Sequence, residues 1–182
     1  CRWHYALVEE KRPGVYMPLQ QADQGSFILN ARDLCMINHI PQLIAAGVRA
    51  LKIEGRMKGI HYVAAVVKAY REAIDAYYRA ERLSAGPQPW DLDLEAVNNR
   101  GFDTGFYFGA PAPADSGPIT PPTQAACRLV GKVLADGTGP DIAIETRNRF
   151  FTGDTVEIIS PGRPIRSRRI DSIRDADGRL ID

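Results

Sequence analysis

A periodic stripe of apolar side chains between Ile60 and Arg82 constrains the fold of this chain more than any other feature. Its apolar residues recur in steps of three and four, which is the repeat of an α-helix with one buried face. The members of the stripe are Ile60, Val63, Ala64, Val67, Tyr70, Ile74, Tyr77 and Tyr78. The segment therefore predicts an amphipathic helix of about six turns, and we interpret its tyrosines as packing residues rather than as a stacking surface.

The residues before this helix, Ala50 to Met57, alternate between apolar and charged side chains. Because successive side chains of a strand point to opposite faces, Lys52 and Glu54 share the face opposite to the apolar residues. Gly55 then ends the strand at a turn into the helix. We predict a buried strand over Ala50 to Glu54, and an edge strand with a solvated Lys/Glu face is the alternative.

Charged side chains at the carboxyl end of such a strand are candidates for catalysis, because barrels and doubly wound sheets keep their chemistry there. The candidate catalytic residues are Lys52, Glu54 and Arg56. Lys52 and Arg56 suit carboxylates or phosphate groups, and the Glu54 carboxylate would orient them or move a proton.

The N-terminal part of the chain predicts short extended elements. Trp3 to Glu9 and Val15 to Leu19 flank a Lys-Arg-Pro-Gly turn, which favours a β-hairpin or a pair of extended arms. Ser26 to Leu29 is a further short strand candidate.

Two helical pieces are predicted before the strand at Ala50. Asn30 and Asp33 are residue types that cap helices, so one or two helical turns are expected over Asp33 to Asn38. A second helix is expected from about Ile40 to Ala46, with Gly47 as its C-cap.

Strand, helix, strand and long helix is the order of an α/β domain with parallel strands and right-handed crossovers. A complete eight-stranded barrel needs about 250 residues. Residues 1–83 are therefore predicted to supply only the closing βα units of a TIM-like barrel.

Residues 84–122 change character, with Pro, Gly and Ala between short apolar islands, and predict a linker. Within them, Phe106 to Phe108 lie between glycines, which free the backbone. The run from Asn98 to Gly109 is interpreted either as a buried aromatic plug between two domains or as a loop that presents Arg100 and an aromatic face to a ligand or to RNA.

Residues 123–182 predict a small antiparallel β-barrel that is truncated at its end. Its short strands are expected within residues 127–135, 141–146, 150–159 and 165–173. An arginine cluster falls in one strand region and consists of Arg163, Arg166, Arg168, Arg169 and Arg174. Such a cluster is commonly a solvated face, but in a small barrel it also engages a phosphate backbone. The candidate RNA-binding residues are therefore Arg100, Arg166, Arg168 and Arg169.

The composition is that of an ordinary soluble protein, with 45% hydrophobic and 25% charged residues. No apolar run reaches the roughly 18 residues of a membrane span, and the N-terminus lacks the layout of a signal peptide, so a cytoplasmic location is expected. Residues 1–84 hold 12 Lys and Arg against 8 Asp and Glu, whereas residues 85–182 hold 11 against 14. This bias is too mild to indicate nucleic-acid binding by itself. Because the chain starts at Cys1 without Met, we expect it to be an internal piece of a longer protein.

The three cysteines do not make a disulfide framework, so a metal or reactive role in a reducing compartment is expected. Cys1 and His4, together with Cys35 and His39, offer the ligands of a structural zinc site, although the gap between the two pairs is long. Cys127 has the pattern of a small core residue in a strand.

Several motifs occur in a fixed order along the chain: CRWHY at Cys1–Tyr5, EEKRPG at Glu9–Gly14, NARDLCM at Asn30–Met36, LKIEGRM at Leu51–Met57 and RGFDTGFYFG at Arg100–Gly109. Together they resemble the C-terminal half of the collagenase-like peptidases of family U32, with a looser fit over the terminal domain. The resemblance implies a TIM-like catalytic domain followed by a small barrel similar to the second domain of translation elongation factors.

The resemblance also implies an activity. Family members with the most similar motifs hydroxylate RNA, which implies prephenate-dependent hydroxylation of the wobble uridine of tRNA at its 5-position, with tRNA and a prephenate-like molecule as partners. Hydroxylation of a cytidine in ribosomal RNA, a collagenase-like peptidase and a non-catalytic RNA-binding module are the alternatives. Against a peptidase, the chain has no HExxH motif and no Ser/His/Asp or Cys/His set at a recognisable spacing.

A further implication of the resemblance is a 4Fe-4S cluster held by four cysteines, of which Cys35 matches the last. The other ligands would lie upstream, in a cysteine-rich stretch that this chain lacks. The chain alone is therefore expected to hold no such cluster and to be inactive by itself.

Overall fold

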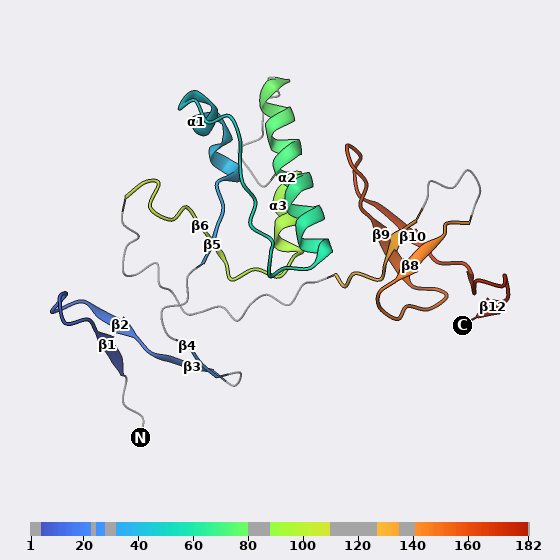
Figure 1. Ribbon diagram of the computed structural model, residues 1–182, viewed down its shortest axis with the longest axis horizontal. Helices are drawn as coiled ribbons and strands as arrows, with labels where there is room; N and C mark the ends of the chain where they lie inside the picture. The colour runs from blue at the N-terminus through green and yellow to red at the C-terminus, as the bar shows by residue number, and fades with distance from the viewer. Residues whose placement is uncertain are drawn as a thin grey trace. The chain divides into compact units, whose positions relative to one another are not determined.

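The computed structural model describes residues 5–22, 25–27, 32–79, 88–109, 127–134 and 141–181 (Figure 1). The chain divides into two compact units, one formed by Cys1–Val48 with Asn98–Gln124 and the other by Arg49–Val97 with Ala125–Asp182. A mixed α/β part is followed in the sequence by a β-rich part, as predicted.

The first unit begins with two short antiparallel hairpins. Strand β1 (Ala6–Val8) pairs with β2 (Tyr16–Pro18), which confirms the hairpin predicted around the Lys-Arg-Pro-Gly turn. Gly14 adopts a positive φ of 88° in that turn, a conformation that glycine tolerates best. Strand β3 (Gln20–Ala22) pairs with β4 (Gly25–Phe27), so the predicted strand at Ser26 exists in part, and residues 28–31 lie outside the described structure.

A parallel ladder follows, at a place where a helix was predicted. Strand β5 (Asp33–Leu34) pairs with β6 (Phe102–Asp103). The ladder is extended by the Asp33 N–H, which donates to the Gly101 carbonyl at 2.9 Å, and by the Cys35 N–H, which donates to the Asp103 carbonyl at 2.8 Å. The prediction that Asp33 caps a helix was wrong, because its backbone is extended and its carboxylate binds a distant arginine.

After β5 the chain turns through the 3₁₀-helix η1 (Ile37–His39) into helix α1 (Ile40–Ala45). Helix α1 ends as predicted at Gly47, whose φ is +85°. The Gly47 N–H donates to the Ile44 carbonyl and the Val48 N–H to the Leu43 carbonyl, which is the Schellman pattern of a helix end. Among the described residues of this unit, the buried hydrophobic side chains come from these two helical pieces and the residue before them: Met36, Ile37, Ile40 and Leu43.

The second unit contains helix α2 (Ile60–Tyr78), which confirms the strongest prediction from the sequence, although the helix ends before Arg82. Helix α3 (Pro89–Glu95) packs against α2, and the two green helices lie side by side in Figure 1. The sequence did not predict α3, which lies within the segment interpreted as a linker. It starts with Pro89 in its first turn and a capping box in which the Gln88 N–H donates to Asp91 Oδ2 at 2.8 Å.

The buried face of α2 differs from the predicted one. The residues that it buries are Ala65, Val66, Ala69, Ala73 and Ala76, while α3 contributes Trp90 and Leu94, and Val97, two residues after α3, is buried as well. Alanine lets two helix backbones approach closely, which fits the packing of α3 against α2. The predicted stripe of larger apolar residues is instead partly exposed, with Ile60, Val63, Val67 and Tyr78 all exposed.

Residues Ala50 to Glu54 do not form the predicted strand; within the described residues they belong to no ladder. The alternation of apolar and charged residues indicates which side chains would share a face if a strand formed. A strand also needs a partner strand whose backbone N–H and C=O groups are unpaired. The prediction of a strand over Ala50 to Glu54 was therefore wrong.

The β-rich part consists of antiparallel pairs. Strand β7 (Gly131–Val133) pairs with β8 (Ile144–Thr146), β9 (Thr155–Ile158) with β10 (Arg166–Arg169), and β11 (Ile173–Arg174) with β12 (Leu180–Ile181). The predicted strands are present in shortened form. Over the ranges that the structure describes, they form separate two-stranded sheets and no closed barrel.

None of the helices that the structure describes is long and apolar enough to cross a membrane.

Lys68 of α2 is the centre of a buried ion network. Its Nζ lies 2.7 Å from Asp93 Oδ2 in α3 and 2.8 Å from Glu72 Oε1 one turn along α2. The side chains of Lys68 and Asp93 are 9% and 8% exposed. Burial lowers the pKa of Lys68, but the hydrogen bonds to Asp93 and Glu72 outweigh it and leave that pKa above its ordinary value. The network joins the two helices at one register.

Removing one partner of this network should destabilise the fold. Asp93→Ala should lower the free energy of unfolding by about 3 kcal/mol, because it removes a carboxylate from a buried ammonium. The double variant Lys68→Met, Asp93→Leu should recover most of that loss, since apolar side chains of similar volume bring no desolvation cost. Urea unfolding followed by circular dichroism measures both.

Arg71→Ala is the matched control, because Arg71 pairs with Asp75 at 2.7 Å on the exposed side of the same helix and should contribute about 0.5 kcal/mol or less. Since the folded-state pKa of Lys68 is raised, the stabilisation is present below the unfolded-state value of about 10.4 and is lost as the pH rises through the folded-state value. A loss in Asp93→Ala no larger than that in Arg71→Ala would contradict this account.

Candidate functional site

The turn before α2 brings two of the three predicted catalytic side chains together. Lys52 Nζ lies 4.0 Å from Glu54 Oε2, and Glu54 Oε1 accepts the Arg56 backbone N–H at 3.0 Å. The side chains of Lys52 and Glu54 are 89% and 71% exposed. Arg56 is exposed as well, and its guanidinium has no ion-pair partner among the described residues. The three side chains therefore lie on one exposed loop, whereas the sequence placed Lys52 and Glu54 on a strand.

This turn is tied closely to the start of α2. The Lys58 N–H donates to the Gly55 carbonyl at 2.9 Å, and the Lys58 ammonium lies 4.7 Å from the centre of the Tyr62 ring. Gly59, the N-cap of α2, has no side chain with which to cap the helix. Cationic side chains thus precede a helix N-terminus whose backbone N–H groups also favour an anion.

Gly55 is required by the close approach of α2. A Cβ atom at this position would lie 2.7 Å from Val63 Cγ2, well inside the contact distance of two carbon atoms. Valine is restricted about χ1, so it cannot move aside at little cost. The sequence indicated Gly55 only as the residue that ends the alternating run, and it did not predict the contact with Val63.

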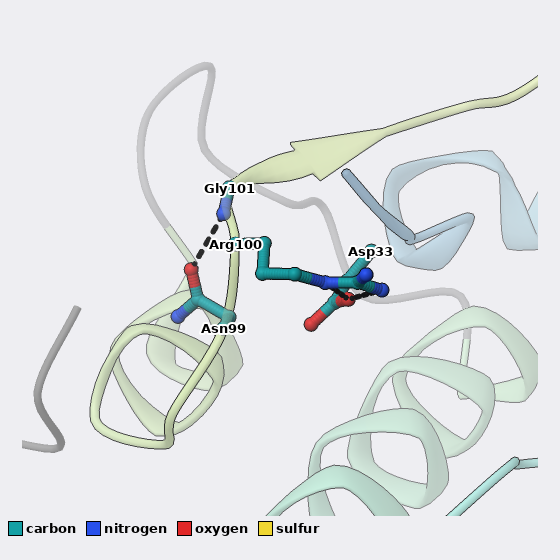
Figure 2. A network of polar contacts seen from close by, with 4 residues as sticks. All are labelled: Asp33, Asn99, Arg100 and Gly101. Carbon is teal, nitrogen blue, oxygen red and sulfur yellow. Dashed lines mark hydrogen bonds and ion pairs between the residues drawn. The ribbon is translucent and has the colours of Figure 1, made fainter. Parts of the chain in front are cut away.

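In the first unit, an ion pair joins Asp33 of β5 to Arg100, which precedes β6. Arg100 Nε and Nη2 both donate to Asp33 Oδ1, at 2.8 and 2.5 Å (Figure 2). Asn99 is buried, and its side-chain Oδ1 accepts the Gly101 N–H at 3.0 Å. Arg100, predicted as an RNA contact, therefore has a second role in positioning β6. Sequence reasoning missed Asp33 as its partner, since no local pattern relates residues 67 positions apart.

Cys35 follows β5 and is half-buried. His39 lies four residues on, and its ring packs on Phe108 with the ring centres 4.6 Å apart. Cys1 and His4, the other two residues of the predicted zinc site, lie outside the described residues. Within the ranges that the structure describes, no three His, Cys, Asp or Glu side chains are grouped as metal ligands.

The aromatic run after β6 is exposed. Phe106, Tyr107 and Phe108 have 80%, 61% and 64% of their surface accessible. This exposure agrees with the second of the two interpretations of the segment, a loop that presents an aromatic face.

Three of the five arginines of the predicted cluster lie on β10, while Arg163 lies in the turn before it and Arg174 in β11. Arg166 and Arg168 stand opposite Ile158 and Val156 of β9, so both arginines project from the same face of the hairpin. Arg169 stands opposite Thr155 and projects from the other face. None of the three has a carboxylate within salt-bridge distance among the described residues.

Cys127 differs from Cys35 in its surroundings. Its Sγ lies 3.7 Å from Glu157 Oε2. Burial and the Glu157 carboxylate raise the pKa of the Cys127 thiol, which disfavours the thiolate that metal binding needs. Cys127 is therefore a poor candidate for a metal ligand.

The sequence matches the profile of Peptidase family U32 over residues 1–116 and the profile of the Peptidase family U32 C-terminal domain over residues 126–182. This chain belongs to peptidase family U32.

Relatives within the family carry names of two kinds. The chain is 34% identical to the tRNA hydroxylation protein P1 of Bacillus subtilis, over 100% of this chain and 43% of the relative. It is 31% identical to the tRNA hydroxylation protein P of Escherichia coli, over 86% of this chain and 34% of the relative. It is 38% identical to a collagenase of Porphyromonas gingivalis, over 60% of this chain and 25% of the relative. The chain thus spans less than half the length of these relatives. No solved structure matches it.

The contact at Gly55 yields a prediction about the turn that carries the candidate catalytic residues. Gly55→Ala should lower the free energy of unfolding by about 2 kcal/mol, because the new methyl group meets Val63. In a Val63→Ala background the same substitution should cost much less, since the opposing methyl groups are gone. Thermal unfolding of the single and double variants measures the coupling. Gly59→Ala, whose new Cβ would meet nothing within 4 Å, is the control, and equal costs at both glycines would contradict the contact.

Proposed function

We propose that this chain is part of an RNA-modifying enzyme that hydroxylates tRNA. The observation that carries the proposal is the match to the tRNA hydroxylation protein P1 of Bacillus subtilis, which covers the whole chain, including residues 126–182 with the arginine strand β10. The match to the collagenase of Porphyromonas gingivalis covers 60% of the chain. We further propose 5-hydroxylation of the wobble uridine, with prephenate as co-substrate.

The exposed turn before α2 would bind the co-substrate. Prephenate carries two carboxylates, and Lys52 and Arg56 offer charged hydrogen-bond donors next to the N-terminus of a helix of 19 residues. Glu54 holds the turn through the Arg56 N–H and has a second carboxylate oxygen 4.0 Å from Lys52. In this proposal Glu54 positions the two cations or transfers a proton.

Arg166, Arg168 and Arg169 would contact the tRNA backbone. Three arginines in four residues have no carboxylate partners among the described residues, and apart from Arg168 Nη1, which donates to the Ser167 carbonyl at 2.9 Å, their guanidinium donors are available for phosphate. The closing units of a TIM-like barrel and a terminal barrel like that of elongation factors remain the architecture that we propose for the whole enzyme.

Cys35 is proposed as one ligand of a 4Fe-4S cluster. The described residues do not complete a ligand set by themselves, because they hold only Cys127 as a second cysteine and its pKa is raised by burial and by Glu157. Cys35 fits one position of the set, since a half-buried thiol with its backbone N–H fixed to the Asp103 carbonyl is held in place. A bound cluster would supply electron transfer.

A collagenase-like peptidase is the second candidate, and the relative from Porphyromonas gingivalis favours it. Hydroxylation of a ribosomal RNA cytidine would use the same residues and differ only in the RNA. Both alternatives predict outcomes that the following experiments separate.

Substitutions at the turn should reduce tRNA hydroxylation without unfolding the protein. In cells that produce only the full-length variant, Arg56→Ala and Glu54→Gln should each lower 5-hydroxyuridine in tRNA at least tenfold, because both side chains would contact or position the co-substrate. Mass spectrometry of digested tRNA measures the modified base. Arg71→Ala, an exposed arginine on the far part of α2, should leave it unchanged.

Normal 5-hydroxyuridine in both variants would contradict the assignment of the turn. Collagen cleavage by the purified protein that is lost in Glu54→Gln would favour the peptidase, and loss of hydroxycytidine from ribosomal RNA would favour the other RNA substrate.

The two cysteines should differ in their effect on metal content. Anaerobically purified full-length protein should contain iron and sulfide, and Cys35→Ser should lose most of both, because an oxygen ligand holds an iron-sulfur centre poorly. Cys127→Ser should keep them and serves as the control. Elemental analysis and the visible absorption spectrum measure the result. Release of zinc in Cys35→Ser would instead favour the zinc site, and unchanged metal in Cys35→Ala would show that Cys35 binds neither.

A further inference from the structure

The aromatic loop, defined here as Phe106 to Phe108, is the largest run of consecutive exposed rings in the part of the chain that the structure describes. The three side chains expose 80%, 61% and 64% of their surface, although burying each of them would be favourable in water. A consecutive exposed set of large aromatics is a candidate interaction surface rather than a packing remnant.

The backbone of the aromatic loop is held by its own hydrogen bonds. The Asp103 carboxylate accepts the Gly105 N–H, the Tyr107 N–H donates to the Thr104 carbonyl at 3.3 Å, and the Gly109 N–H donates to the Phe106 carbonyl at 3.3 Å. Gly105 and Gly109 take positive φ values of 58° and 114° on either side of the rings. A loop fixed in this way loses little conformational entropy when it binds.

The loop is also anchored to the parallel ladder and to η1. A Cβ atom on Gly105 would lie 3.3 Å from Leu34 Cδ1, so the loop packs directly on β5. The Phe108 ring lies 4.6 Å from the His39 ring at an angle of 51°, so His39 supports Phe108 while most of the Phe108 ring stays exposed.

Two arginines lie at the same ladder, just before its strands, whereas the aromatic loop follows the end of β6. Arg32 is exposed, and its side chain passes 3.9 Å from where a Cβ of Gly101 would be. Arg100 is held by Asp33 and has donors beyond the two that this pair uses. A nucleic-acid strand that lies along the ladder would meet exposed rings at one end and arginines at the other, and stacking combined with attraction for phosphate is what binds single-stranded nucleic acid.

We propose that the aromatic loop stacks unpaired nucleotides of an RNA substrate, with Arg32 and Arg100, which precede the two strands of the ladder, attracting phosphates further along the same RNA strand. The inference deepens the proposed function, on which it rests for the choice of RNA. It adds that the loop binds a single-stranded segment of the RNA rather than a duplex. Bases within a duplex are stacked on each other and offer no free face to a ring. A protein segment that covers the loop is the other possible occupant, and the experiment distinguishes the two.

The test compares binding of two RNA probes to the full-length protein at one salt concentration. One probe is a fluorescein-labelled single strand of about ten nucleotides without self-complementarity, and the other is the same strand annealed to its complement. Phe106→Ala and Phe108→Ala should each weaken binding of the single strand about tenfold and leave binding of the duplex unchanged. Fluorescence anisotropy measures both dissociation constants.

The conservative variants Phe106→Tyr and Phe108→Trp should bind the single strand like the unmodified protein, because each keeps an aromatic face. Phe151→Ala is the matched control, since Phe151 is another exposed phenylalanine, 51% accessible, and should change neither constant. Thermal unfolding is measured for every variant.

Unchanged affinity of both alanine variants for the single strand would overturn the inference, and so would an equal loss for both probes. A marked fall in the Tm of Phe106→Ala and Phe108→Ala would show that a protein segment covers the rings, and would overturn it as well. The result is independent of catalysis. If tRNA is hydroxylated normally while the alanine variants bind normally, only this inference fails; if the single strand binds as expected but the protein hydroxylates no tRNA, only the proposed function fails.

Discussion

A two-residue parallel ladder brings together parts of the chain that are far apart in sequence. Strands β5 and β6 are separated by the whole α-helical region, and the ion pair beside them joins Asp33 to Arg100 across 67 positions. Closing so long a loop costs chain entropy, which the hydrogen bonds of the ladder and the charged pair offset in part. Every candidate group of the first unit depends on this closure, because Cys35 is bonded to Asp103 and the aromatic loop packs on Leu34. The Asp33–Arg100 pair therefore helps to hold the two strands next to which these groups lie.

The sequence predicted those elements whose cause is local. The hairpin around Gly14, the end of α1 at Gly47 and the existence of α2 each follow from turn chemistry or helical period within a few residues. The α/β part, the β-rich part and the family followed from pattern and motif. The features that the sequence did not predict depend on contacts between residues far apart in the chain, which local patterns do not identify. Tertiary structure decides three such features: the ladder partner of Asp33, the absence of a ladder for Ala50 to Glu54 over the described residues, and the face of α2 that is buried against α3.

The buried face of α2 is set by its contact with α3 rather than by the hydrophobicity of its own residues. The larger residues of the predicted stripe contain more apolar surface than the alanines do, so transfer from water alone would bury the larger ones. Helix α3 instead meets the alanine face, where Lys68 can reach Asp93 at 2.7 Å. A buried ion pair adds little net stability compared with apolar packing, but a mismatch at either partner is costly. Such a pair favours one alignment of α2 with α3 over others that alanine packing alone would tolerate. The periodicity of apolar residues in the sequence does not indicate this pair.

The net charge of +1 conceals an uneven use of carboxylates. Among the described residues, the carboxylates paired with a nearby cation are Glu9, Asp33, Glu54, Glu72, Asp75, Asp93 and Glu145. The arginines of β10 and the guanidinium of Arg56 have no carboxylate partner in the same ranges. Local positive potential, rather than total charge, is what attracts a phosphate backbone. Phosphate contacts of this kind position a nucleic acid without reading it, so discrimination between paired and unpaired nucleotides must come from a group that recognises a base face. In the described part of this chain, the exposed rings between Gly105 and Gly109 have the chemistry for that task.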